Sequence, residues 1–236
     1  MVDFHTHILP EIDDGSNSVE MSIAMLGEMR KQGVDTIIAT PHFSPQRQTV
    51  ADFLQYRQQA IDKINPYLDG IKIIPAAEVK YCRNISRIEE IEKVSIGNSA
   101  YILIEMTYRE WDKQTVDDVI SIIDNTGLTP ILAHVDRYWN KDTEKFFDRF
   151  LDAGVLMQLN VSSFEKFWNR RRFLKLIEEG RIHLLGSDCH NMTKRFPNLD
   201  VGFKVLEKKN LVSIVESNEE MVLSSSLSVL TNKNSV

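Results

Sequence analysis

Short apolar segments typical of β-strands alternate with helical segments along nearly the whole chain. The strand-like segments recur roughly every 25 to 36 residues, the length of a strand and its crossover helix in a parallel sheet. Residues 71–74 and 101–104 are almost continuously apolar, as strands covered by helices should be. Seven such units predict a closed or nearly closed β/α barrel. An open, doubly wound sheet is the alternative, but no Gly-rich nucleotide-binding loop follows any of the strands.

The boundaries of the elements follow from capping residues and hydrophobic periodicity. The first helix is expected to be capped by Asn17, with Glu20 at its third position, and to end at Gly33. After the opening strand, we expect strands at residues 36–40, 71–77, 101–104, 130–133, 155–160 and 183–186. Further helices are expected at residues 50–64, 85–92, 115–124, 143–151 and 163–179.

Size and composition predict one soluble domain covering residues 1–236, with a polar C-terminus of about 15 residues that frays. No apolar run approaches the ~20 residues of a membrane helix, and no signal peptide is recognisable, so we expect a cytoplasmic protein without direct membrane insertion. The net charge of −6 argues against nucleic-acid binding. The basic residues 170–172 indicate a solvated helix face or a docking patch for an acidic partner. The two cysteines, Cys82 and Cys189, predict no disulfide framework.

Histidines and carboxylates gather where the predicted strands end. His5 and His7 project to the same side of the opening strand, because side chains alternate along a strand. Asp13 and Asp14 follow in a turn that Gly15 closes. Later strand ends carry His42, Glu78, Glu105, His134, Asp188 and His190. Because carboxyl ends of parallel strands converge on one mouth of a barrel, we expect these residues to meet there.

This set of imidazoles and carboxylates without a thiolate suits Mn, Fe or Zn in a catalytic site. Counting one of the two neighbouring aspartates, there are nine candidate ligands, which are too many for one ion. Two or three metals are therefore expected, with Glu78 and Glu105 as bridges. Such a cluster lowers the pKa of a bridging water and neutralises charge on a reacting phosphate. The pattern therefore predicts hydrolysis of a phosphoester.

Two arginines on the same loops are candidates for phosphate binding. Arg137 lies three residues after His134, and Arg195 lies five residues after His190. A guanidinium on such a loop can bind two phosphate oxygens at once. Asp136 is interpreted as a supporting carboxylate, and His183, at the opposite end of its strand, as a structural or surface histidine.

Several short motifs together resemble those of PHP-domain (polymerase and histidinol phosphatase) proteins. Within that superfamily the chain resembles the bacterial manganese-dependent protein-tyrosine phosphatases of capsule and exopolysaccharide operons, and the likeness spans residues 1 to about 209. The motifs are the opening His-Thr-His, Leu9-Pro-Glu-Ile-Asp-Asp-Gly15, Ala39-Thr-Pro-His42, Ala77-Glu78, Ile104-Glu105, Ala133-His134-Val-Asp-Arg137, Gly186-Ser-Asp188-Cys-His190-Asn191 and Arg195-Phe-Pro-Asn198.

The resemblance implies a seven-stranded PHP-type barrel, like a distorted TIM barrel, with a trinuclear metal cluster, most commonly of Mn²⁺. It implies that the substrate is phosphotyrosine on the Tyr-rich, autophosphorylated tail of a cognate membrane-associated tyrosine kinase, and so a role in capsular or exopolysaccharide synthesis. The implied metal ligands are His5, His7, Asp14, His42, Glu78, Glu105, His134, Asp188 and His190. The implied catalytic, phosphate-binding residues are Arg137 and Arg195. Asp14 is preferred to Asp13 from the family pattern alone.

Other functions compete with this one. Residues 189–195 formally match Cys-x5-Arg, the signature of cysteine-dependent tyrosine phosphatases, and Cys189 stands where relatives commonly have alanine. The loop has no glycine to wrap around phosphate, and Phe196-Pro197 follows where a helix should begin, so we interpret the match as accidental. A PHP-type small-molecule phosphatase such as histidinol phosphatase, a TatD-like nuclease and a non-catalytic binding module are the remaining alternatives.

Overall fold

Parallel strands form the centre of the protein in the computed structural model, which describes residues 1–108 and 111–225. The strands are β1 (Val2–Thr6), β2 (Thr36–Ala39), β3 (His42–Phe43), β4 (Lys72–Pro75), β5 (Glu78–Lys80), β6 (Tyr101–Glu105), β7 (Thr129–Leu132), β8 (Leu156–Asn160) and β9 (Leu184–Gly186). One sheet has the order β1-β2-β4, and the other has the order β3-β5-β6-β7-β8-β9. The predicted α/β architecture with a parallel sheet is confirmed.

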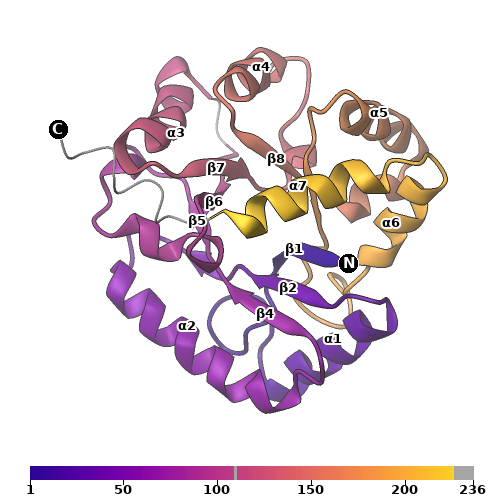
Figure 1. The fold of residues 1–236 in the computed structure, drawn as a ribbon. Helices are drawn as coiled ribbons and strands as arrows, with labels where there is room; N and C mark the ends of the chain where they lie inside the picture. The colour runs from indigo at the N-terminus through magenta and orange to yellow at the C-terminus, as the bar shows by residue number, and fades with distance from the viewer. Residues whose placement is uncertain (109–110, 226–236) are drawn as a thin grey trace.

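Helices surround this curled sheet (Figure 1). They are α1 (Val19–Lys31), α2 (Val50–Ile64), α3 (Lys113–Thr126), α4 (Glu144–Asp152), α5 (Phe167–Glu178), α6 (Leu199–Glu207) and α7 (Val212–Ser224). Helices α1 to α5 lie on the outside of the sheet, whereas α7 crosses one end of the strands. Among the described residues, no helix is long and apolar enough to cross a membrane.

The described residues form nine short strands where seven were predicted, because the short strands β3 and β5 follow just beyond the strands predicted at 36–40 and 71–77. The segment at residues 36–43 is interrupted before Pro41, whose ring nitrogen has no hydrogen to donate to a neighbouring strand. The segment at residues 72–80 is interrupted at the same level. Backbone bonds continue across both breaks, because Ala76 N–H donates to Ala39 O at 2.9 Å and Glu78 N–H donates to Pro41 O at 3.1 Å.

The first strand of the described residues, β1, lies beside the segment that follows the last one, β9. Thr6 of β1 forms an isolated parallel bridge with Cys189, just past β9. Asp188 N–H donates to His5 O at 2.8 Å, and Ser187 N–H donates to the buried Asp3 carboxylate at 2.9 Å. These bonds hold the first strand of the chain against the last one.

Some helix boundaries were predicted correctly and others were not. Helix α2 has the predicted bounds, and α3 ends before Gly127, which adopts φ 74°. The prediction that Asn17 caps α1 is wrong, since Ser18 is the cap and its hydroxyl accepts from Met21 N–H at 3.1 Å.

Two predicted α-helices are partly replaced by 3₁₀ turns. In place of one α-helix at residues 85–92, the structure has the short 3₁₀ helices Ile85–Arg87 and Ile91–Val94, the second of which extends beyond the predicted end. Likewise, the predicted helix at 163–179 opens with the 3₁₀ helix Val161–Glu165 before α5 begins. The predicted frayed C-terminus lies, from residue 226 onward, outside the described residues.

Two apolar clusters hold the fold together. The larger cluster packs the helices against the outer face of the strands. The smaller cluster takes side chains from strands around the sheet and from α7: Phe4, Ile38, Ile74, Leu103, Ile131, Leu156, Leu184 and Val222. This inner cluster fixes the strands relative to one another, and the candidate site lies at their carboxyl ends.

Candidate metal centre

The opening strand presents two buried histidines to the interior. His5 and His7 stand at the end of β1 and just past it, and their Nε2 atoms are 3.1 Å apart. His5 Nδ1 lies 3.0 Å from Oε1 of Gln158 on β8. His7 Nδ1 donates to Asp13 Oδ2 at 2.7 Å. Each ring is therefore held through one nitrogen, and its other nitrogen points into the shared space.

The two neighbouring aspartates of the following turn have different positions. Asp13 is buried and also accepts from the backbone N–H groups of His42 and Gly15, both at 2.9 Å. Asp14 is exposed, and its Oδ1 lies 3.3 Å from His42 Nε2 and 3.6 Å from His190 Nε2. Asp13 thus orients histidines, whereas Asp14 offers a free carboxylate to the cluster.

Glu78 on β5 lies at the centre of the cluster. Its Oε2 is 2.9 Å from Nδ1 of His42 and 3.3 Å from Nε2 of both His5 and His7. Its Oε1 is 2.8 Å from His134 Nε2. Glu105, at the end of β6, lies 3.9 Å from His42 and from His134. The two glutamates therefore stand between histidines from different strands.

Two of the remaining ligand candidates, His134 and Asp188, have a strained backbone conformation. His134 has φ 35° and Asp188 has φ 54°, a left-handed conformation that side chains other than glycine adopt at a cost of about 1–3 kcal/mol each. Asp188 Oδ1 lies 3.4 Å from His7 Nε2 and 3.6 Å from His5 Nε2. All nine predicted ligands lie in this one cluster.

The pKa shifts of Glu78 and His190 suit cation binding. Burial would favour a neutral carboxyl at Glu78, but the surrounding His5, His134 and His42 hold its pKa well below the usual range. Burial, with the nearby His7 and Arg195, lowers the pKa of His190 to about 3. A carboxylate and a neutral imidazole are the forms of these groups that bind metal ions.

The donor atoms are close enough to share metal ions. Three groups each have ligand atoms within 4.8 Å of one another: His7, Asp14, His42 and His190; His5, His7 and Asp188; and His42, Glu78 and Glu105. Glu78 Oε2 and His190 Nε2 are buried without a hydrogen bond to any of the described residues. Buried polar atoms without partners are costly, and a bound cation would satisfy both, so the residues fit a multinuclear metal site.

Both predicted phosphate-binding arginines contact the same ligand candidate. Arg137 donates to Asp188 Oδ2, and Arg195 donates to Asp188 Oδ1 at 2.6 Å. Each guanidinium is partly exposed and keeps further N–H groups for other acceptors. Arg137 also donates to the hydroxyl of Tyr108 at 3.3 Å.

A cavity of about 410 Å³ opens beside Arg137. Its aromatic lining includes Tyr108, Trp111 and Tyr138, and the centroid of the Tyr138 ring lies 5.2 Å from that of Tyr108 and 5.5 Å from that of Trp111. The ring of Tyr138 also lies 5.6 Å from that of His134. An aromatic pocket thus adjoins the metal-ligand cluster.

Sequence reasoning missed two supporting residues on β8. Gln158 Oε1 accepts from His134 N–H at 2.7 Å in addition to contacting His5. Asn160 Nδ2 donates to Asp188 Oδ2 at 2.9 Å, and its backbone N–H donates to Asp136 at 3.1 Å. The available signal was the presence of two amide side chains in an otherwise apolar buried strand. Asp136 is thus in contact with Asn160, and its expected role as a supporting carboxylate stays a prediction.

The Cys-x5-Arg segment lacks the geometry of a thiolate phosphatase. Cys189 is fully buried, and burial raises the pKa of its thiol. Backbone N–H groups of His190 and Asn191 donate to Arg195 O, at 2.7 and 3.1 Å, so they do not converge on a phosphate site. His183 has the structural role expected, since its Nδ1 accepts from Met157 N–H at 3.0 Å.

Comparisons with known proteins agree on one group. Residues 1–224 match the family model described as capsular polysaccharide synthesis, CpsB/CapC. The tyrosine-protein phosphatase CpsB of Streptococcus pneumoniae is 31% identical over 225 residues, covering 89% of this chain and 90% of that protein. The tyrosine-protein phosphatase YwqE of Bacillus subtilis is 26% identical over 235 residues, covering 94% and 91%.

A solved structure of these proteins shares the fold. It comes from work on YwqE of Bacillus subtilis and CpsB of Streptococcus pneumoniae, which are described as metal-dependent tyrosine phosphatases. The TM-score is 0.80 at 24% sequence identity, and 96% of each chain is covered.

Proposed function

The chain belongs to the capsular polysaccharide synthesis CpsB/CapC family, and we propose that it is a metal-dependent tyrosine phosphatase that acts on protein phosphotyrosine. The observation that carries the proposal is the single cluster of five histidines and four carboxylates. Nothing in the stability of a domain requires nine polar groups at one place, and burying them costs free energy unless a ligand compensates. The proposed reaction is that of relatives which match this chain over most of their length and are named tyrosine-protein phosphatases.

We assign the metal ligands as His5, His7, Asp14, His42, Glu78, Glu105, His134, Asp188 and His190. Two or three ions, Mn²⁺ in the first place and Fe or Zn as alternatives, suit a set of imidazole and carboxylate donors. When bound, such ions supply a water of lowered pKa as nucleophile and positive charge beside the reacting phosphate.

The chain's own residues then bind and orient the substrate. Arg137 and Arg195 lie on either side of Asp188 and keep N–H donors for the phosphate oxygens. Asp13 and Gln158 hold His7 and His5 in fixed ring orientations. These contacts keep the site in place before substrate arrives.

The aromatic pocket beside Arg137 suits the phenyl ring of phosphotyrosine. A substrate phosphate at Arg137 would have its ring within reach of Tyr108, Trp111 and Tyr138. Aromatic rings pack favourably against one another. The shorter side chains of phosphoserine and phosphothreonine bring no ring to this pocket. A small metabolite such as histidinol phosphate remains the second candidate substrate.

We also propose that the chain is one catalytic domain over residues 1–236 built on a distorted seven-stranded PHP-type barrel. The divided pairs β2/β3 and β4/β5 would each count as one strand, and the bridge from Thr6 to Cys189 would close the ring. As physiological partner we propose the Tyr-rich tail of a membrane-associated tyrosine kinase of capsule synthesis, with the phosphatase acting from the cytoplasm.

The test is initial-rate hydrolysis of a phosphotyrosyl peptide by the wild type and by Cys189→Ser, each with Mn²⁺ and with EDTA. We expect equal, Mn²⁺-dependent rates for both proteins. Activity that survives EDTA and is lost in Cys189→Ser would refute the metal mechanism. If histidinol phosphate were hydrolysed much faster than the peptide, a small phosphate ester would replace protein phosphotyrosine as the proposed substrate.

A further inference from the structure

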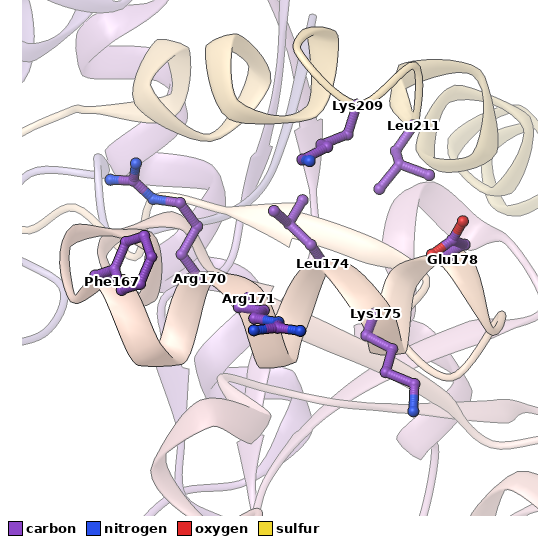
Figure 2. A pocket seen from close by; sticks show the side chains of 8 residues that line it. All are labelled: Phe167, Arg170, Arg171, Leu174, Lys175, Glu178, Lys209 and Leu211. Atoms are coloured by element: carbon purple, nitrogen blue, oxygen red, sulfur yellow. The ribbon is translucent and has the colours of Figure 1, made fainter.

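A cavity of about 650 Å³ lies outside the metal centre, between α5 and the segment that joins α6 to α7. Figure 2 shows Leu174 of α5 facing Lys209 and Leu211 across this space. We call it the basic groove, and its lining residues are Phe167, Arg170, Arg171, Leu174, Lys175, Glu178, Lys209 and Leu211. Nothing in the proposed reaction uses it.

The charge of the groove is opposite to that of the whole protein. Four of its eight lining residues are cationic and one is acidic, a balance of +3 in a chain of net charge −6. The side chains of Arg171 on one wall and of Lys209 on the other make no ion pair or hydrogen bond with any of the described residues. Their charges are therefore available to a partner.

Two large aromatic side chains stand exposed at the start of the groove's helix. Phe167 is 75% exposed and Trp168 is 74% exposed. Large exposed aromatics beside arginines are typical of protein interaction sites, where Trp and Arg carry much of the binding energy. The same turn is held firmly, because Arg170 Nε donates to Phe164 O at 2.8 Å.

The groove begins on the same side of the molecule as the metal centre. Asn160, the last residue of β8, donates to the ligand candidate Asp188. The 3₁₀ helix Val161–Glu165 follows, and α5 begins at Phe167. A peptide segment of about ten residues spans ~33 Å when extended, enough to run from the mouth of the strands along α5.

We propose that the basic groove binds an acidic peptide segment of the protein substrate, next to the phosphotyrosine that enters the metal centre. The identification of that partner as substrate rests on the proposed phosphatase function. The basic groove is hollowed and has apolar side chains between charged walls. An extended peptide chain therefore fits it better than a flat anionic surface, such as a membrane, would fit it. Cations at the groove then select acidic flanking sequences and hold the substrate near the reacting group.

The test compares two synthetic phosphotyrosyl peptides of equal length, one with Glu and Asp in its flanking segment and one with Gln and Asn instead. The groove variant is Arg171→Gln/Lys209→Gln. Its control, Lys72→Gln/Arg87→Gln, makes the same charge change at two exposed, unpaired positions elsewhere. With Mn²⁺, we expect the groove variant to raise KM for the acidic peptide about tenfold, with unchanged kcat and an unchanged KM for the neutral peptide.

A salt dependence and a direct binding assay test whether the effect comes from charge at the basic groove. The preference of the wild type for the acidic peptide should shrink as salt rises from about 50 mM to about 0.5 M. Fluorescence anisotropy of the labelled, unphosphorylated acidic peptide should show binding to the wild type and to the control variant, and much weaker binding to the groove variant.

Three outcomes would overturn the inference: equal KM values of the wild type for both peptides, equal loss in the control variant, or binding of phosphatidylserine vesicles through the groove without binding of the acidic peptide. The anisotropy assay does not depend on catalysis. If the wild type hydrolysed neither peptide but bound the acidic one through the groove, the phosphatase function would fail and the acidic-segment site would stand. If the wild type hydrolysed both peptides equally well, the phosphatase function would stand and the acidic-segment site would fail.

Discussion

Exchange of Asp13 for asparagine tests how the cluster is supported. Asp13 accepts three hydrogen bonds, from His7 Nδ1 and His42 N at Oδ2 and from Gly15 N at Oδ1. An asparagine has only one oxygen, so in either orientation its amide nitrogen faces at least one of these donors. One buried donor without an acceptor costs about 1–3 kcal/mol.

This loss should appear chiefly as weaker metal binding. His7 donates from Nδ1 to Asp13, which leaves the Nε2 lone pair for a metal ion. Removal of such a supporting carboxylate typically weakens metal binding or activity by about 10–100-fold. We therefore expect Asp13→Asn to bind Mn²⁺ about 10–100-fold more weakly, with unchanged stoichiometry and activity that returns at saturating Mn²⁺.

Isothermal titration of metal-free protein with Mn²⁺ measures both quantities. Asp152→Asn, an exposed carboxylate on α4, is the matched control and should bind like the wild type. Asp14→Asn should lose a ligand, so its activity should remain low at any Mn²⁺ concentration. Wild-type affinity in Asp13→Asn, or loss of a bound ion from it, would show that the roles of the two aspartates are assigned wrongly.

Three further predictions follow from single contacts. Gly186→Ala should destabilise the protein by about 1–3 kcal/mol in chemical denaturation, because an added Cβ would lie 2.6 Å from His5 Cβ and 2.8 Å from Gln158 Nε2; stability equal to the wild type would contradict that packing. Burial raises the pKa of Glu219 to about 8, so the folded state keeps a proton that the unfolded state releases above about pH 4.5, and stability should fall as pH rises between these values. Glu219→Gln should remove this fall and raise the melting temperature at pH 8 and above, and an unchanged pH profile would count against a buried, protonated Glu219. Tyr108→Ala should raise KM for a phosphotyrosyl peptide about 2–10-fold without changing KM for a phosphoseryl peptide, as steady-state kinetics would show; equal effects on both would argue against a ring pocket.

The sequence was informative about the site because the candidate ligands follow a geometric rule. Parallel strands place their carboxyl ends together, so His42, Glu105 and His134 could be grouped from their positions after apolar segments. Helix α2 could be bounded because Asn65-Pro66 ends its periodic pattern. These features depend on local chemistry that is visible within a few residues.

Other features depend on partners that are distant in sequence. Gln158 stands out as an amide in a buried strand, but its role becomes visible only when His5 and His134 are placed beside it. The choice of Ser18 as cap depends on a one-residue difference in where the helix begins, which periodicity does not resolve. The shared contact of Arg137 and Arg195 with Asp188 becomes visible only when two loops are brought together.

The pairing of β1 with the segment after β9 also bears on the order of events during synthesis. Asp3 accepts a hydrogen bond from Ser187, which lies 184 residues later in the chain. At a translation rate of about 5–20 residues per second, the first strand waits roughly 9–37 s for that partner to be made. His5 and His7 are thus made well before Asp188 and His190, with which they share the cluster. A nascent chain that stalls in between exposes an unpaired strand edge, and the cluster of histidines and carboxylates can form completely only after His190 has been made.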